Sequence, residues 1–219
     1  MIVAIDGPAG SGKTTAARLL AKLLNVSYLD TGATYRALTL AALNKNLDLS
    51  CEQILVELAK ELNLEIRGEK IYLDGLDISS QIRTPRIDKN ISIVVSHPKV
   101  REVMVRLQRK VAKEGDFVVE GRDITTVVFP QSQFKFYLDA DPAVRVQRRF
   151  KELEEKGLRV DYQEIKRDLE KRDHADKNRE VGPLKISDDA IIIDTTNLTI
   201  GQSAEKIAEY IDSHKSSCP

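Results

Sequence analysis

The chain has 219 residues, and its 34 Lys and Arg are balanced by 34 Asp and Glu. A neutral balance argues against a general binder of nucleic acid or of membrane surfaces. Its two cysteines, Cys51 and Cys218, have no spacing typical of a metal site or disulfide framework, which favours the reducing cytoplasm. We expect no signal segment before the first strand, and no apolar run approaches the ~20 residues that cross a bilayer. We expect a cytoplasmic monomer.

Five short apolar runs predict buried strands, at 2–5, 26–29, 117–120, 134–138 and 190–194. Stretches with helical spacing separate most of them, so the fold class is α/β, three layers with a five-stranded parallel sheet. Asp141 and Pro142 predict the start of a helix that stops at Gly157. Asp161, with Glu164 three residues later, predicts the capping box of the next helix. The C-terminal tail from 213 onward is expected to fray.

The first strand leads into "GPAGSGKT", which satisfies G-x-x-x-x-G-K-[ST]. Backbone N–H groups of such a loop curl around an anion, and the following helix adds its positive end. Lys13 can then reach the β- and γ-phosphates of a nucleotide, and the Thr14 hydroxyl can bind Mg²⁺. The nucleotide-binding residues predicted here are Gly7, Pro8, Ala9, Gly10, Ser11, Gly12, Lys13, Thr14 and Thr15. A mere tight turn is the alternative, but the strand before and the helix after favour a nucleoside triphosphate site.

This loop alone does not choose between GTPases, motor ATPases and small-molecule kinases. A GTPase would need N-K-x-D for guanine, and the nearest string, "NKNLD" at 44–48, places its aspartate one residue late. The residues that bind the phosphoryl acceptor must therefore identify the reaction.

The interval between the second and third strands, 29–117, is several times longer than a crossover helix requires. Within it, 64–79 has apolar strand-like residues with turn signals at Gly68 and Gly75, which predicts a small antiparallel element. Insertions on α/β cores usually serve binding, although a decorative insertion remains the alternative.

The string "YLDTGATYR" at 28–36 ends the second strand and opens a helix. Asp30 and Thr31 are therefore expected at the carboxyl edge of the sheet, where open α/β folds bind ligands, with Arg36 facing the same crevice. Taken alone, the string is equally typical of an ordinary N-cap followed by a solvated arginine.

Arginines from further segments are expected at the same edge. Arg122 and Asp123 follow the third strand, and the helix from Asp141 presents three arginines at i, i+3 and i+4: Arg145, Arg148 and Arg149. In "KRDHADKNRE" (171–180), Arg172, Asp176 and Arg179 fall at i, i+4 and i+7, which predicts one helical stripe. A solvated charged face is the alternative for that stretch. Convergence of arginines on a phosphate site indicates phosphoryl transfer, which depends on positioning and charge neutralisation.

In the combination of these motifs, the chain resembles the bacterial cytidylate kinases of the nucleoside monophosphate kinase group. The matching strings are "IDGPAGSGKTT", "LDTGATYR", "IRTPRIDKNISIVVSHPKVRE", "EGRDITTVVFP", "EKRDHADKNRE" and "IDTTNLT", in the family's order over nearly the whole chain. The resemblance implies a single kinase domain in three parts: a core (1–30, 101–149 and 180–219), a monophosphate-binding insert (31–100) and a helical lid (150–179). It implies transfer of the γ-phosphoryl group from ATP, with Mg²⁺, to CMP or dCMP.

The resemblance also implies a residue map. Arg36, Arg122 and Arg179 would bind the acceptor phosphate, Arg172 and Asp176 would lie near the ribose, and Ser92, Arg101 and Asp123 would face the base, with Thr31 as a further substrate contact. Lys13, Arg122, Arg148 and Arg179 are assigned to catalysis. The family often has serine where Thr31 stands and aspartate where Glu120 stands, and both replacements keep the polar chemistry.

The base can also be argued from chemistry. Cytosine offers an amino donor beside two acceptors, which a carboxylate such as Asp123 and a guanidinium such as Arg101 complement. Uracil would turn a carbonyl oxygen toward Asp123, a mismatch that is heavily penalised. Two rivals stay open: a kinase for UMP or for a non-nucleotide hydroxyl, and an ATP-binding switch without transfer. For 150–179, the alternative to a lid is a static solvated hairpin.

Overall fold

The computed structural model describes residues 1–113, 115–155 and 157–215, so Cys218 and the end of the predicted frayed tail lie outside the described residues. The chain divides into two compact units. The first contains Met1–Val26 and the described chain from Phe117 onward, and the second is Ser27–Asp116. Within the described ranges, no helix is both long enough and apolar enough to cross a membrane.

The five predicted strands are confirmed as one sheet in the order β2-β6-β1-β7-β8. They are β1 (Ile2–Asp6), β2 (Ser27–Asp30), β6 (Phe117–Gly121), β7 (Phe134–Asp139) and β8 (Ile191–Asp194). The central strand β1 pairs in parallel with β6 and β7, and β7 pairs in parallel with β8. The strands are nearly continuous apolar runs because flanking helices cover the sheet.

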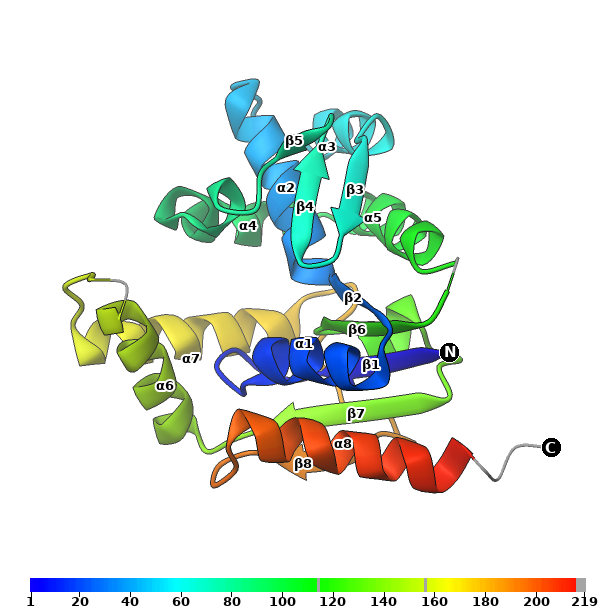
Figure 1. The fold of residues 1–219 in the computed structure, drawn as a ribbon. Helices are drawn as coiled ribbons and strands as arrows, with labels where there is room; N and C mark the ends of the chain where they lie inside the picture. The colour runs from blue at the N-terminus through cyan, green and yellow to red at the C-terminus, as the bar shows by residue number, and fades with distance from the viewer. Residues whose placement is uncertain (114, 156, 216–219) are drawn as a thin grey trace. The chain divides into compact units, whose positions relative to one another are not determined.

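Four long helices complete the first unit: α1 (Lys13–Leu24), α6 (Pro142–Glu155), α7 (Tyr162–Asn178) and α8 (Ile200–Lys215). Figure 1 shows α1 and α8 against the sheet, with α6 and α7 beyond the ends of β1 and β7. The predicted caps are confirmed, since Asp141 accepts a hydrogen bond from the Ala143 N–H (2.8 Å) and Asp161 accepts one from the Glu164 N–H (2.9 Å). The chain leaves α6 through Gly157, whose φ is +73°.

The second unit is mainly helical, with α2 (Thr31–Asn44), α3 (Glu52–Lys60), α4 (Pro85–Ser96), α5 (Pro98–Val111) and the short 3₁₀ turn η1 (Gln81–Arg83). The predicted antiparallel element is confirmed as β3 (Leu64–Arg67), β4 (Lys70–Leu73) and β5 (Leu76–Asp77). Its turns fall at Gly68 and Gly75, both with positive φ. One apolar cluster joins α2 to this sheet, and another joins α2, α3 and α5.

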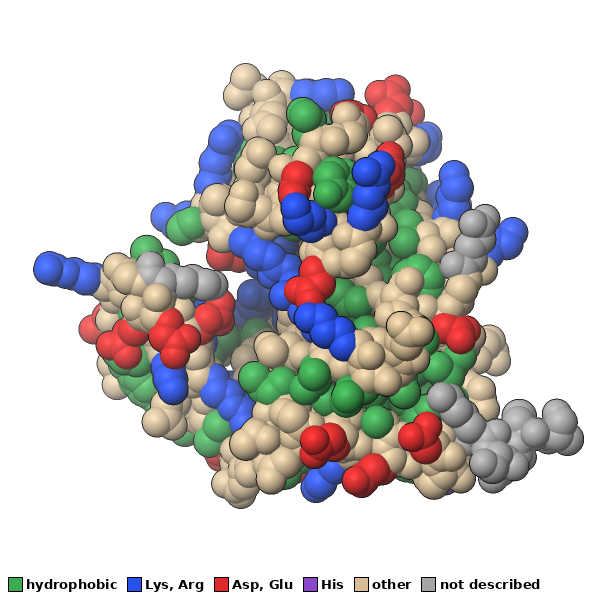
Figure 2. Space-filling model, viewed as in Figure 1, with side chains coloured by type: hydrophobic (Ala, Val, Ile, Leu, Met, Phe, Trp, Pro, Cys, Tyr) green, Lys and Arg blue, Asp and Glu red, His purple; other side chains and the backbone are tan. Residues whose placement is uncertain are grey.

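The boundary of the second unit differs from the predicted insert, 31–100, because α5 packs on α2 and α3 and therefore belongs with them. The functional division into core, insert and lid stays a prediction. Figure 2 shows side chains of both charge signs scattered over the viewed face of each unit, as expected from a net charge of zero.

Candidate active site

The phosphate-binding loop runs from the end of β1 to the start of α1, and close packing explains its glycines. A Cβ at Gly7 would lie 2.1 Å from the Leu138 carbonyl oxygen, and one at Gly10 would lie 3.0 Å from the Arg145 Cβ. Both positions therefore require glycine. The loop ends at Gly12, the N-cap of α1 with φ +83°, so the N-terminus of that helix opens toward the loop.

Lys13 is buried and donates from Nζ to the Pro8 carbonyl oxygen at 2.9 Å, which folds its side chain back along the loop. Burial, followed by the nearby positive charge of Arg122, lowers the pKa of Lys13 to about 7. The carboxylate of Glu120 opposes this shift. Because burial disfavours the charged form of Lys13, a bound anion would stabilise that form.

Two further loop residues provide oxygen atoms. The Thr14 hydroxyl donates to Glu120 Oε1 at 2.7 Å, and Glu120 is buried at the end of β6. The Ser11 hydroxyl is buried and has no hydrogen-bond partner among the described residues. Thr15, by contrast, is exposed on α1.

A cluster of charges from β6 and α7 lies near the loop. Arg122 Nε donates to Asp176 Oδ2 at 2.8 Å, and Arg179 lies 3.4 Å from Asp123 and 3.7 Å from Asp176. Burial would raise the pKa of Asp176, but Arg122, Arg172 and Arg179 outweigh burial and hold it below its usual range. For Arg122 burial acts downward, while Asp176 and Glu120 shift the pKa upward on balance. Both groups are therefore held in their charged forms.

The predicted helical stripe through Arg172, Asp176 and Arg179 is wrong at its end. The helix α7 ends at Asn178, and Arg179 is its C-cap with extended backbone (φ −66°, ψ 145°). The Arg179 side chain still meets Asp176 because the chain turns there, and its Nε donates to the Gly182 carbonyl oxygen. Arg172 itself is exposed on α7.

The three arginines of α6 do not act as one face. Arg145 is buried and donates from Nη1 to the Ala9 carbonyl oxygen (3.0 Å) and to Asp173 (2.5 Å). Arg148 lies beside Gly12 and donates to the carbonyl oxygen of Thr195 at 2.6 Å. Arg149 instead pairs with Glu152 on its own helix, so its predicted convergence on the phosphates is wrong.

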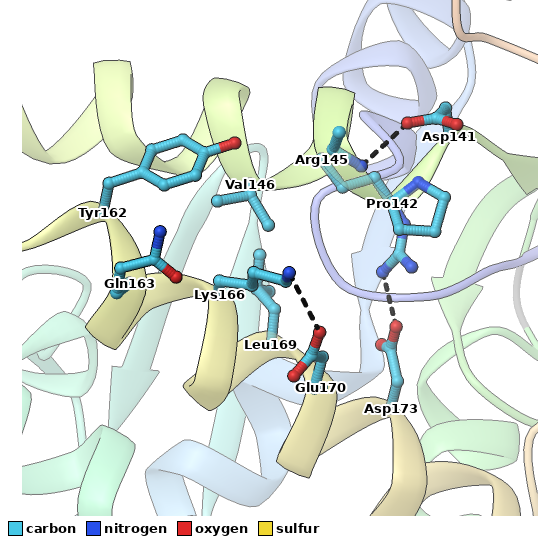
Figure 3. Close-up of a pocket in the computed structure, with 11 residues that line it drawn as sticks. Asp141, Pro142, Arg145, Val146, Tyr162, Gln163, Lys166, Leu169, Glu170 and Asp173 are labelled. Carbon is cyan, nitrogen blue, oxygen red and sulfur yellow. Dashed lines mark hydrogen bonds and ion pairs between the residues drawn. The ribbon is translucent and has the colours of Figure 1, made fainter.

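The helices α6 and α7 are joined to the phosphate-binding loop by a small apolar cluster of Ala9, Val146, Ile165 and Leu169. The segment 150–179 has few apolar residues, and two of them, Ile165 and Leu169 of α7, belong to this cluster with Ala9 of the loop. A hollow of about 430 Å³ lies between the two helices. Figure 3 shows the side chains that line it, with the pair of Arg145 and Asp173 at one end. Of the arginines predicted to converge on the phosphates, Arg145 lines this hollow, whereas Lys13, Arg122 and Arg179 do not.

The loop after β6 is fixed by Asp6, the last residue of β1, which the sequence reasoning did not single out. Asp6 is completely buried and accepts hydrogen bonds from the N–H groups of Ile124 (2.9 Å) and Thr125 (2.8 Å) and from the Thr125 hydroxyl (2.7 Å). The sequence signal that could have found it is an aspartate in an otherwise apolar strand directly before the glycine-rich loop.

The predicted acceptor residues of the second unit lie at the first turns of α2 and on α4 and α5. Asp30 caps α2 by accepting from the Ala33 N–H at 2.9 Å, and Thr31 is buried behind it. Arg36 is held by Asp88 (2.6 Å) and by the Ile82 carbonyl oxygen (3.1 Å). The side chain of Arg36, a predicted phosphate contact, is thus oriented by its neighbours.

Arg101 is 2% exposed and lies over the Tyr35 ring, 5.4 Å from its centroid. Ser92 is exposed on α4. Asp123, the predicted partner of Arg101 in base recognition, belongs to the first unit. Their pairing therefore stays a prediction.

The parallel sheet, the glycine loop with its buried lysine, and the arginine cluster beside it define a P-loop phosphotransferase. A family model for cytidylate kinase matches residues 3–213, and the chain belongs to that family. The resemblance seen in the sequence is thereby confirmed.

Curated relatives agree with this assignment. The chain is 47% identical to a cytidylate kinase of Caldanaerobacter subterraneus subsp. tengcongensis, covering 95% of this chain and 93% of the relative. It is 46% identical to that of Clostridium tetani (97% and 94% covered) and 44% identical to that of Fusobacterium nucleatum (98% and 99%). Among solved structures, a shikimate kinase from Acinetobacter baumannii is 19% identical over 98% of this chain and 94% of its own, and its TM-score of 0.45 carries no weight for function.

Proposed function

We propose that this member of the cytidylate kinase family transfers the γ-phosphoryl group of ATP to CMP or dCMP, which gives ADP and CDP or dCDP. The observation that carries the proposal is the buried Lys13 in a glycine-rich loop at the N-terminus of α1. Burial lowers the pKa of Lys13, and Arg122 and Arg172 lower it further against the opposing charges of Glu120 and Asp176, so its charged form costs stability in the absence of an anion. Bound phosphates would remove that cost.

On the donor side, the loop N–H groups and Lys13 would bind the β- and γ-phosphates, with Arg148 beside Gly12 stabilising the charge that develops during transfer. On the acceptor side, Arg36, Arg122 and Arg179 would hold the phosphate of CMP. One of its oxygens attacks the γ-phosphorus in line, and the bond from that phosphorus to the β–γ bridging oxygen breaks, so ADP leaves. The acceptor is already an anion at neutral pH and needs no general base.

The donor set near Lys13 fits Mg²⁺. The Thr14 hydroxyl and the Glu120 carboxylate are hard oxygen donors with their oxygens 2.7 Å apart, and Mg²⁺ is usually held by one or two protein oxygens plus phosphates and water. The Thr14 hydroxyl would bind the ion directly, and Glu120, which accepts a hydrogen bond from this hydroxyl, would orient the hydroxyl. The ion would neutralise negative charge on the β- and γ-phosphates.

Replacing Glu120 with glutamine should raise the Mg²⁺ concentration needed for half-maximal activity by roughly tenfold, because the amide keeps the shape and loses the charge. The measurement is a Mg²⁺ titration of ADP release. Glu102→Gln, which removes an exposed carboxylate on α5, is the matched control. An unchanged titration in Glu120→Gln would remove Glu120 from the metal site.

The proposed lid predicts that hydrogen exchange in α7 slows more with an ATP analogue plus CMP than with either alone. The apolar cluster around Ala9 and the pair of Arg145 and Asp173 already link α7 to the loop that would bind ATP, and Asp176 links it to Arg122. Peptides from α8 serve as the internal control. Equal protection of α7 with and without nucleotides would mean a static hairpin.

The reaction itself is tested by a coupled assay of ADP release with CMP, dCMP, UMP and AMP. We expect turnover with CMP and dCMP well above that with UMP and AMP. A preference for UMP would establish the rival kinase, and ATP binding without CMP-dependent ADP release would establish a nucleotide-binding switch.

A further inference from the structure

We propose that Asp6 is a positioning residue for base specificity: it caps the helical turn after β6 and thereby keeps the Asp123 carboxylate out of that cap. The inference rests on the proposed function, because it assumes that Asp123 reads the base. Asp6 is the last residue of β1, the strand that pairs with β6, and it lies one position before the phosphate-binding loop.

The turn in question is the single π-helical turn η2 (Ile124–Val128), which begins directly after Asp123. Its first two N–H groups, those of Ile124 and Thr125, both donate to Asp6 at 2.9 and 2.8 Å. These are the groups that a helix N-terminus leaves without an internal partner. A residue from β1 therefore caps a helical turn that follows β6.

Asp123 stands at the N-cap position of this turn, and aspartate is among the strongest N-cap residues. Its carboxylate nevertheless makes no capping hydrogen bond. It lies 3.4 Å from Arg179, in the arginine cluster of the site. An N-cap side chain accepts from the second or third N–H of its helix, and the second of these, that of Thr125, is already bonded to Asp6. The two carboxylates therefore compete for this N–H group.

The electrostatics agree with this competition. Burial raises the pKa of Asp6, the hydrogen bonds from Thr125 and Ile124 lower it, and the negative charge of Asp123 raises it further. Repulsion between the two carboxylates thus disfavours a second carboxylate in the cap and favours the orientation of Asp123 toward Arg179. The buried charge of Asp6 lowers the free energy of unfolding. In return, Asp6 keeps the Asp123 side chain in the orientation in which it would face the base.

The test replaces Asp6 with asparagine, which has nearly the same shape but only one acceptor oxygen for three donors. We expect the Asp123 carboxylate to move toward the vacated cap, and the ratio of kcat/KM for CMP over UMP to fall about tenfold, the loss of one directed polar contact. The KM for ATP should change by less than about twofold. Asp123→Asn is measured alongside, as the direct test of base reading.

Two further variants make the result specific. Thr125→Val deletes only the hydroxyl bond of 2.7 Å and keeps both backbone bonds, so the ratio should fall by about threefold. Ser132→Ala deletes a partly buried hydroxyl, which donates to the carbonyl oxygens of Ile2 and Phe134 near the opposite end of the sheet. It should lower the melting temperature and leave the ratio unchanged. In the double variant Asp6→Asn/Asp123→Asn, the ratio should equal that of Asp123→Asn alone.

If Asp6→Asn does not fold, Thr125→Val decides by the same ratio. The proposal is overturned if Asp123→Asn changes the ratio while neither Asp6→Asn nor Thr125→Val does, or if Ser132→Ala changes it as much as they do. If Asp123→Asn itself leaves the ratio unchanged, the base-reading step of the proposed function has failed, and this inference falls with it.

Discussion

Replacing Lys13 with methionine should lower kcat for CMP phosphorylation by roughly 100-fold or more, while the protein still folds. The Lys13 ammonium donates to the Pro8 carbonyl oxygen, and burial lowers its pKa to about 7. Its charge therefore contributes little to folding and is expected to act on the phosphates, where one such group commonly contributes a factor of that size. Steady-state ADP release with saturating ATP and CMP is the measurement.

The stability of Lys13→Met supplies the control, because the substitution should raise the unfolding free energy while it lowers kcat. The pKa of Lys13 is about 7 in the folded protein against 10.5 when it is exposed, so between these values the unfolded chain holds one more proton. The unfolding free energy of the wild type should then rise with pH relative to Lys13→Met, by about 1.4 kcal/mol per pH unit within that window. The advantage of Lys13→Met should be greatest at pH 7 and below. Near-normal turnover in the folded variant would rule out the donor site.

Local patterns in the sequence predict the elements and the donor loop because their causes are local. Apolar runs form buried strands, the proline after Asp141 and the glutamate after Asp161 mark helix starts, and the spacing of glycine and lysine in 7–14 specifies a phosphate loop. These features depend on residues within a few positions of one another. The sequence therefore predicts the fold and the conformation of the glycine-rich loop.

Partner choice of charged side chains was harder to predict, because it depends on which carboxylate lies nearest in space. Arg145 and Arg149 lie four positions apart on α6, yet Arg145 forms an ion pair with Asp173 of α7, whereas Arg149 forms one with Glu152 on its own helix. The spacing predicts Arg179 on a helical stripe, but α7 ends one residue earlier, at Asn178. Residue spacing predicts on which side of a helix a side chain lies. It does not predict the ion-pair partner of that side chain or the residue at which the helix ends.

The long-range contacts explain what the sequence missed. Asp6 lies 118 positions from the Ile124 N–H that it binds, and Thr14 lies 106 positions from Glu120. Each pair is brought together only by the parallel pairing of β1 with β6. An acidic residue at the end of a buried strand was the single hint available for either contact, and it does not identify the partner.

Asp123→Asn should reduce the ratio of kcat/KM for CMP over UMP by roughly 100-fold, mainly through faster turnover of UMP. A carboxylate can only accept hydrogen bonds, so it suits the amino group of cytosine and leaves the O4 of uracil facing a buried negative charge. An amide can donate to O4 or accept from the amino group, which removes the penalty on UMP. The substitution also neutralises the partner of Arg179 at 3.4 Å, so some loss of CMP turnover is expected as well.

The measurement compares kcat/KM for both nucleotides in wild type, Asp123→Asn and Asp188→Asn, which removes an exposed carboxylate elsewhere in the first unit. Because Asp123 binds Arg179 and Arg179 is proposed to hold the acceptor phosphate, loss of the charge pair alone would slow both substrates equally and leave the ratio unchanged. A changed ratio therefore reports on the base and not on the phosphate. A ratio that stays within twofold of wild type would place cytosine recognition on other residues, with Arg101 and Ser92 of the second unit as the next to be replaced.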